Sequence, residues 1–304
     1  MDTSAQPDAA DAPTPRDDTL FVQGHTMCPG CGVALAVNHV MDVLGENTVV
    51  LFSPGCLSAA STIEDNYRFR VPSSHMGLVH SASFAAGVSA GLERLGLGDV
   101  TVAPLAGDGA TGDIGLQALS AAAERNDDVL YICHDNEAYA NTGVQGSATS
   151  PQGAATTTTP AGTAAPYGKV SRKKDLFRLV TDHDVPYAAT ATPGYLGDFR
   201  RKLEAARDAD GFRFVQLFDP CPEGWKFDAS LTVEVSKLAV QTGMWVLAES
   251  RYGEVTVTRK PARREPVDAY LALQGRFEHL TPEEIADVQA GVDDYWAGYV
   301  EEGA

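Results

Sequence analysis

The stretch that most constrains the fold runs from residue 105 to 145, LAGDGATGDIGLQALSAAAERNDDVLYICHDNEAYANTGVQ. An apolar run over residues 100–105 ends in Gly107-Asp108-Gly109, helical spacing of apolar residues follows, and a second apolar run covers residues 129–133. This order of strand, glycine-rich turn, helix and strand predicts an α/β fold with a mostly parallel sheet and helices on both faces. Because such sheets bind ligands beyond the carboxyl ends of their strands, we expect the functional site there.

Two polar clusters follow these strands. Asp108 lies in the glycine-rich turn, and Asp135 and Asn136 follow the second strand, with Asn136 28 positions after Asp108. Glycines let the backbone approach a phosphate, and Mg²⁺ is usually held by one or two carboxylates together with substrate phosphates and water. The residues alone leave two interpretations open, a magnesium-diphosphate site or a glycine-rich turn with Asp135 and Asn136 as turn formers.

Four of the five cysteines lie on predicted turns next to glycine or proline: Cys28, Cys31, Cys56 and Cys221. Cys133 lies inside an apolar run, and we expect it to be a buried small hydrophobe. The Cys-x-x-Cys pair at Cys28 and Cys31 is compatible with a redox disulfide, a zinc site, an iron–sulfur site or two buried thiols. In a cytoplasmic protein four loop cysteines favour a metal over disulfides. Zinc and a [4Fe–4S] cluster both accept four thiolates, and the residues alone favour the commoner zinc slightly.

Charge and length exclude several classes of function. The chain has 304 residues, a net charge of −18 and a pI near 4.6, which argue against binding nucleic acid or an anionic membrane surface. No apolar run approaches the 18 or so residues of a membrane span. Residues 1–20 are acidic and rich in proline and alanine, without the features of a secretory signal. We expect a disordered leader followed by a single domain over residues 21–304, a cytoplasmic location and, because the chain is acidic and poor in lysine, a halophilic source.

The segment DIGLQALSAAAERNDDVLYICHDNEAYANTG, with the preceding GDG, resembles the thiamine diphosphate-binding β subunit of pyruvate and other 2-oxoacid:ferredoxin oxidoreductases. The likeness extends to CPGCG at residue 28 and PCPEGW at residue 220, and spans roughly residues 21–297. It departs at Val33, where many relatives have Glu. The resemblance implies a thiamine diphosphate-binding fold and oxidative decarboxylation of a 2-oxoacid, with pyruvate expected, to acyl-CoA and CO₂. Electrons would pass through a [4Fe–4S] cluster to ferredoxin.

The same resemblance assigns individual residues. The ligands of the [4Fe–4S] cluster would be Cys28, Cys31, Cys56 and Cys221. The Mg²⁺ ligands would be Asp108, Asn136 and the carbonyl of Ala138. Further contacts to the cofactor would come from Gly107, Gly109, Cys56, His75 and Asn141. Asn141 would also act toward the diphosphate or the substrate as a catalytic residue, whereas His75 is equally explained as a structural histidine.

The resemblance also implies partners. A separate α subunit would supply the glutamate that activates the coenzyme and most of the substrate carboxylate site, so this chain would be inactive alone. Coenzyme A and ferredoxin complete the reaction. Three alternatives stay open: a non-redox thiamine decarboxylase or carboligase with structural zinc, a 2-oxoglutarate or branched-chain oxoacid enzyme of the same family, and a non-catalytic iron–sulfur carrier.

Two segments have more than one interpretation. Residues 137–168 lack apolar periodicity, and their composition favours disorder, whereas the resemblance places them over the cofactor and against the partner subunit. Four cations cluster at Lys169, Arg172, Lys173 and Lys174. They are expected to form either the solvated start of a helix or a contact with an acidic partner such as ferredoxin. Towards the C-terminus the pattern predicts two helices flanking a hairpin at residues 245–259.

Overall fold

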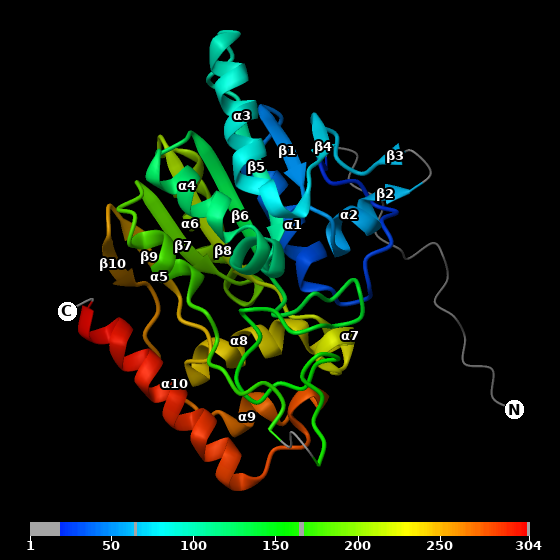
Figure 1. The fold of residues 1–304 in the computed structure, drawn as a ribbon, viewed down its shortest axis with the longest axis vertical. Helices are drawn as coiled ribbons and strands as arrows, with labels where there is room; N and C mark the ends of the chain where they lie inside the picture. The colour runs from blue at the N-terminus through cyan, green and yellow to red at the C-terminus, as the bar shows by residue number, and fades with distance from the viewer. Residues whose placement is uncertain (1–18, 64–65, 164–166, 303–304) are drawn as a thin grey trace, which may run out of the picture.

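The computed structural model describes residues 19–63, 66–163 and 167–302, so most of the predicted leader lies outside the described residues. An eight-stranded sheet has the order β10-β9-β7-β8-β6-β5-β1-β4 (Figure 1). Six neighbouring strands are parallel, and β9 and β10 add an antiparallel hairpin at one edge. The strands are β1 (Thr48–Phe52), β4 (Ser73–His75), β5 (Thr101–Gly107), β6 (Val129–Asp135), β7 (Tyr187–Ala191), β8 (Phe212–Phe218), β9 (Ala248–Arg251) and β10 (Glu254–Val257).

Helices cover both faces of the sheet, as the sequence predicts. The helices α1 (Gly32–Leu44) and α6 (Leu196–Arg207) pack on one face, and α3 (Ser81–Arg94), α4 (Leu116–Glu124) and α5 (Leu176–Thr181) on the other. Alternate residues of β6 enter the two cores: Leu130 and Ile132 face α1 and α6, while Tyr131 and Cys133 face the opposite core. Every residue of β6 and β8 is buried, because helices cover both faces of the sheet, although β8 contains Arg213 and Gln216. Cys133 is fully buried, as expected.

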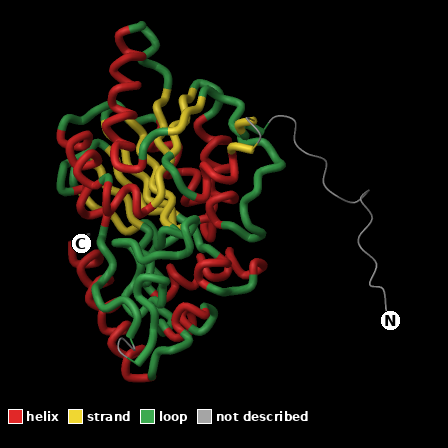
Figure 2. The backbone as a smooth tube through the Cα atoms, turned by 45° about the vertical axis from the view of Figure 1, so that its right-hand side comes forward, coloured by secondary structure: helices red, strands yellow, loops and turns green. Residues whose placement is uncertain are grey.

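A third core lies beyond the carboxyl ends of the parallel strands. It is built by α7 (Pro222–Trp225), α8 (Thr232–Thr242), α9 (Asp268–Leu271) and α10 (Pro282–Glu302). Figure 2 shows the long loops gathered in this half of the molecule, below the strands. The remaining elements are α2 (Cys56–Ser61), β2 (Thr62–Ile63), β3 (Asn66–Tyr67), η2 (Leu78–His80), η3 (Ala110–Ile114), η4 (Pro193–Tyr195), η5 (Ala229–Leu231) and η6 (Gly275–Phe277). In the described part no helix is both long and apolar enough to cross a membrane.

The composition-based prediction of disorder over residues 137–168 is wrong for the described part of that segment. It has no helix or long strand, yet Ser147, Thr149, Ser150 and Ala154 are buried. Side-chain hydroxyls replace secondary structure there, since Ser150 donates to the carbonyl of Glu137 and Thr149 contacts buried carboxylates. Small polar residues therefore serve this segment as internal hydrogen-bonding groups.

Both interpretations of the basic cluster need correction. Lys169 is buried and donates from Nζ to the carbonyls of Ala148 and Ser150. Lys173 turns inward to Asp135 and Glu137, and Lys174 turns to the carbonyl of Gly112. Only Arg172 is well exposed, and it pairs with Asp294. Lys169 and Lys174 donate to backbone carbonyls and Lys173 pairs with buried carboxylates, so the three lysines form neither a solvated helix start nor a free surface for an acidic partner.

Candidate functional site

The sheet brings the predicted motifs together because they follow neighbouring parallel strands. Phe52 of β1 pairs with Leu105 of β5, Gly107 pairs with His134 of β6, and Asp135 pairs with Phe218 of β8. The carboxyl ends of these four strands therefore lie together at one end of the sheet. Four polar turns follow β1, β5, β6 and β8 in that order: the turn before Cys56, the GDG turn, the Asp-Asn pair and the Cys221 turn.

Three oxygen-bearing groups converge where magnesium was predicted. One end of the Asn136 amide lies 2.7 Å from the carbonyl oxygen of Ala138 and 3.3 Å from Oδ1 of Asp108. With its nitrogen at that end, the amide donates to both oxygens; turned over, it places a third oxygen beside them. Octahedral Mg²⁺ at 2.0–2.1 Å from its ligands separates adjacent oxygens by about 2.9 Å. The two distances from the Asn136 amide are therefore close to the separation of adjacent Mg²⁺ ligands.

A second buried carboxylate lies close to Asp108. The Thr149 hydroxyl is 2.8 Å from Oδ2 of Asp108 and 2.8 Å from Oδ1 of Asp135, and it has one proton to share between them. Burial and the Asp135 charge raise the pKa of Asp108 well above its ordinary value. Asp135 also receives hydrogen bonds from Gln216 and from the backbone N–H of Glu137. A cation at Asp108 would relieve this concentration of negative charge.

A cavity of about 160 Å³ adjoins these groups and is lined by Gly107, Asp108, Gly109, Asn136, Ala138 and Asn141, among others. Gly109 is required by packing, because a Cβ there would lie 2.3 Å from the Tyr139 ring. His75 is not brought into this cavity. It is exposed on β4, with its ring edge against Phe52.

The four loop cysteines line a second cavity, also about 160 Å³. Cys28 and Cys31 lie before α1, Cys56 begins α2, and Cys221 precedes α7. Gly32 lets the turn of Cys28 and Cys31 pack against the turn before Cys221, since a Cβ at Gly32 would lie 2.8 Å from the Asp219 backbone. Three residues line both cavities: Cys56, Asn136 and Asn141. The two predicted sites therefore adjoin each other.

The four loop cysteines are chemically suited to hold a metal centre. All four are free thiols, and burial raises the pKa of Cys31 and of Cys56 to about 12, so they need a metal to ionise. Within the described ranges no three His, Cys, Asp or Glu side chains converge as ligands of one metal ion. Tetrahedral zinc needs all four sulfurs about 2.3 Å from one centre, whereas a cluster binds each thiolate to a different iron and spaces them more widely. Zinc and a cluster both stay predictions for these four thiols.

Several buried residues near the site were missed from the sequence. Thr149, Glu137, Lys173 and Arg276 surround the Asp-Asn turn, and Asp219 is fully buried between this turn and the cysteine cavity. Thr149 lies in a low-complexity segment and Arg276 near the opposite end of the chain, so neither gives a local signal. Glu137 follows Asn136 directly, but its left-handed φ of 58° is invisible in the sequence.

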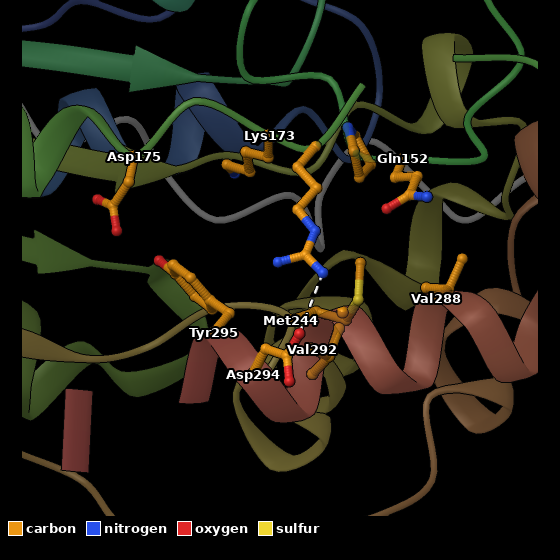
Figure 3. A pocket seen from close by; sticks show the side chains of 11 residues that line it. Gln152, Lys173, Asp175, Met244, Val288, Val292, Asp294 and Tyr295 are labelled. Carbon is orange, nitrogen blue, oxygen red and sulfur yellow. Dashed lines mark hydrogen bonds and ion pairs between the residues drawn. The ribbon is translucent and has the colours of Figure 1, made fainter. Parts of the chain in front are cut away.

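A third cavity, of about 200 Å³, lies between the segment after Pro151 and helix α10. Figure 3 shows Met244, Val288, Val292 and Tyr295 along it. Arg172 also lines the cavity and donates a hydrogen bond to Asp294. It contains none of the residues predicted to bind a cofactor. Lys173 also lines it, and the Lys173 ammonium contacts Asp135 and Glu137.

Known proteins are similar to this chain in sequence or in fold. Residues 54–217 match the model of the thiamine pyrophosphate enzyme C-terminal TPP-binding domain. The pyruvate synthase subunit PorB of Methanothermobacter thermautotrophicus is 44% identical over 91% of this chain and 96% of its own. The ketoisovalerate oxidoreductase subunit VorB of Pyrococcus horikoshii is 38% identical over 91% of both chains. A solved 2-oxoglutarate:ferredoxin oxidoreductase from Magnetococcus marinus is similar in fold, with a TM-score of 0.54 and 22% identity over 70% of this chain and 77% of that one.

Proposed function

This chain belongs to the β-subunit family of the 2-oxoacid:ferredoxin oxidoreductases, and we propose that it binds thiamine diphosphate, Mg²⁺ and a [4Fe–4S] cluster and oxidises pyruvate. The reaction consumes a 2-oxoacid, coenzyme A and two oxidised ferredoxins, and yields acyl-CoA, CO₂, a proton and two reduced ferredoxins. We propose pyruvate and not a branched-chain oxoacid as the substrate, because of these two relatives the pyruvate synthase subunit is the more similar, at 44% against 38% identity.

The observation that carries the proposal is the sharing of Cys56, Asn136 and Asn141 by the two cavities. When bound, thiamine diphosphate supplies the nucleophilic carbon for decarboxylation and the cluster accepts electrons singly. The protein must therefore hold the two cofactors next to each other. The contiguous cavities support this role for the Cys56 turn, which borders both.

Each side chain then has a defined task. Asp108, Asn136 and the carbonyl of Ala138 would hold Mg²⁺, and the turn at Gly107 and Gly109 would face the diphosphate. Asn141 is exposed and borders both cavities, so it would orient the diphosphate or the substrate from the solvent side. Apolar side chains of the cysteine cavity, among them Met27, Val33 and Ala60, would restrict water there. His75 has no contact that supports a role.

A partner subunit would complete the site. The cavity beside Asp108 measures about 160 Å³, below the roughly 300–1,000 Å³ of typical cofactor sites. In the described part of the chain the carboxylates that line the two cavities beside Asn141 are Asp108 and Asp219, and both are buried, so neither is placed to activate the coenzyme. We therefore assign the activating glutamate and most substrate contacts to an α subunit, with residues 21–304 acting as one unit beside it in the cytoplasm.

The test is to purify this chain with its α subunit without oxygen and to record EPR spectra before and after adding pyruvate and coenzyme A. A reduced [4Fe–4S] signal that requires pyruvate would support cofactor, cluster and substrate together. A signal with 2-oxoglutarate or a branched-chain oxoacid instead would change only the substrate. A complex containing zinc and no iron, silent with every oxoacid, would refute the redox function and leave a non-redox thiamine enzyme. Reduction with dithionite serves as the control that a cluster is present.

A further inference from the structure

The residue after Asn136 adopts an unusual conformation. Glu137 has a φ of 58°, in the left-handed region that side chains other than glycine rarely adopt, and only 2% of it is exposed. Across this turn one end of the Asn136 amide lies 2.7 Å from the carbonyl oxygen of Ala138 and 3.3 Å from Oδ1 of Asp108. Such a conformation persists only where the surrounding structure holds it.

Two cations hold the Glu137 side chain. Oε1 accepts a hydrogen bond from Lys173 Nζ at 2.8 Å, and Oε2 accepts one from Arg276 Nη2 at 2.7 Å. Arg276 is itself 3% exposed and is further bonded to Gln274 and Tyr270. Glu137 is therefore a buried anchor bonded to two cationic side chains.

Arg276 also contacts the cysteine side of the site. Its guanidinium lies 3.8 Å from the centre of the Trp225 ring. The Trp225 indole N–H donates to the carbonyl oxygen of Asn136 at 2.9 Å, and the Trp225 backbone N–H donates to the carbonyl of Cys221, also at 2.9 Å. One side chain from the C-terminal part of the chain therefore touches both turns.

We propose that Arg276 is a positioning residue. Through Glu137 and Trp225 it holds the Asn136–Ala138 turn and the Cys221 turn at a fixed relative position, and so fixes the magnesium oxygens beside the cysteine cavity. This inference rests on the proposed function for the identity of the bound groups. Arg276 touches neither cavity and acts only through its two neighbours. Residues that orient metal ligands from behind typically contribute about 10- to 100-fold to metal affinity.

The experiment compares Arg276→Met with the unaltered αβ complex. Mg²⁺ affinity is measured by titration calorimetry at saturating thiamine diphosphate, and iron content and the dithionite-reduced EPR signal are recorded on the same samples. Arg276→Met should weaken Mg²⁺ binding by about 10- to 100-fold and retain its iron, because no cysteine is altered. Arg276→Lys should recover part of that loss, because lysine keeps the positive charge but lacks the planar guanidinium with its several N–H donors.

Arg213→Met is the matched control, because Arg213 is also buried and paired, with Asp128, but lies at the opposite end of the sheet strands. It should lower thermal stability without changing Mg²⁺ affinity. If Arg276→Met does not assemble, the double variant Glu137→Gln/Arg276→Met replaces it, since it leaves no unpaired buried charge. It too should bind Mg²⁺ at least tenfold more weakly than the unaltered complex.

The outcomes separate this inference from the proposed function. The positioning role alone would be overturned if Arg276→Met or the double variant bound Mg²⁺ with unchanged affinity. It would also be overturned if Arg213→Met lost as much Mg²⁺ affinity as the Arg276 variants. An unaltered complex that binds no thiamine diphosphate would overturn the proposed function and this inference with it. A selective loss in the Arg276 variants, partly recovered by lysine, would support both.

Discussion

Asp108→Asn should stabilise the cofactor-free protein and abolish its response to cofactor. The substitution keeps the shape of a side chain that is 1% exposed and removes one of two neighbouring negative charges. Because burial and Asp135 raise the pKa of Asp108 in the folded state, the carboxyl contributes most stability when protonated. That contribution is lost as the pH rises from the ordinary aspartate pKa of 3.8 through the raised folded value.

The magnitude follows from the shared Thr149 hydroxyl. Oδ2 of Asp108 and Oδ1 of Asp135 each lie 2.8 Å from Thr149 Oγ1, so they are at most twice that distance apart. Two charges at this separation repel by about 3 kcal/mol at an effective dielectric constant of about 20. Lys173 offsets part of this repulsion. We therefore expect Asp108→Asn to gain about 1–3 kcal/mol at pH 8, or about 3–10 °C in thermal midpoint.

The assay is thermal unfolding of the αβ complex at pH 5 and pH 8, with and without Mg²⁺ and thiamine diphosphate. Ligand at a hundred times its Kd should stabilise the unaltered complex by about 2.7 kcal/mol and Asp108→Asn not at all. Asp219→Asn is the matched control. Asp219 is fully buried, neither of its carboxylate oxygens has a hydrogen-bond partner in the described structure, and burial together with Asp135 raises its pKa. It should gain stability and keep the cofactor response.

Two results would refute this reasoning. A full response of Asp108→Asn to Mg²⁺ and thiamine diphosphate would remove Asp108 from the magnesium site. An unchanged or lower midpoint without ligand at pH 8 would show that the buried carboxylate pair does not destabilise the fold.

Three further changes test other parts of the molecule. Thr149→Val should destabilise the cofactor-free complex by about 1–3 kcal/mol, because two buried carboxylates lose their shared donor, whereas Thr149→Ser should not; thermal unfolding distinguishes them. Cys56→Ser should lower ferredoxin reduction more than CO₂ release from pyruvate, measured with labelled substrate; equal losses would contradict separate sites. Lys202 is fully buried against Asp198, and burial lowers its pKa from 10.5 to about 8, so the folded state binds fewer protons than the unfolded state between these values. Stability should therefore rise with pH across this window in the unaltered protein and not in Lys202→Met, as urea midpoints at pH 7.5 and 10 would reveal.

Much of the architecture could be predicted because periodicity reports local structure. The strand over residues 212–218, the hairpin near residue 250 and the helix after Cys31 all appear as expected. The lysines at 169, 173 and 174 were misinterpreted because charge on a helix start normally faces solvent, whereas here buried carbonyls and carboxylates attract it inward. Thr149 gave no signal, since a hydroxyl that serves two carboxylates resembles any loop threonine.

By itself the sequence determined the strands, the turns at their carboxyl ends, and the kinds of ligand on those turns, because each depends on residues close together in the chain. Only the tertiary structure decided that Cys56 and Asn141 border both cavities, that Asp108 and Asp135 share one proton donor, and that Arg276 reaches Glu137 and Trp225. These relations join residues up to 139 positions apart. They depend on strand order and on the desolvation of charges in the folded core, which local patterns do not encode.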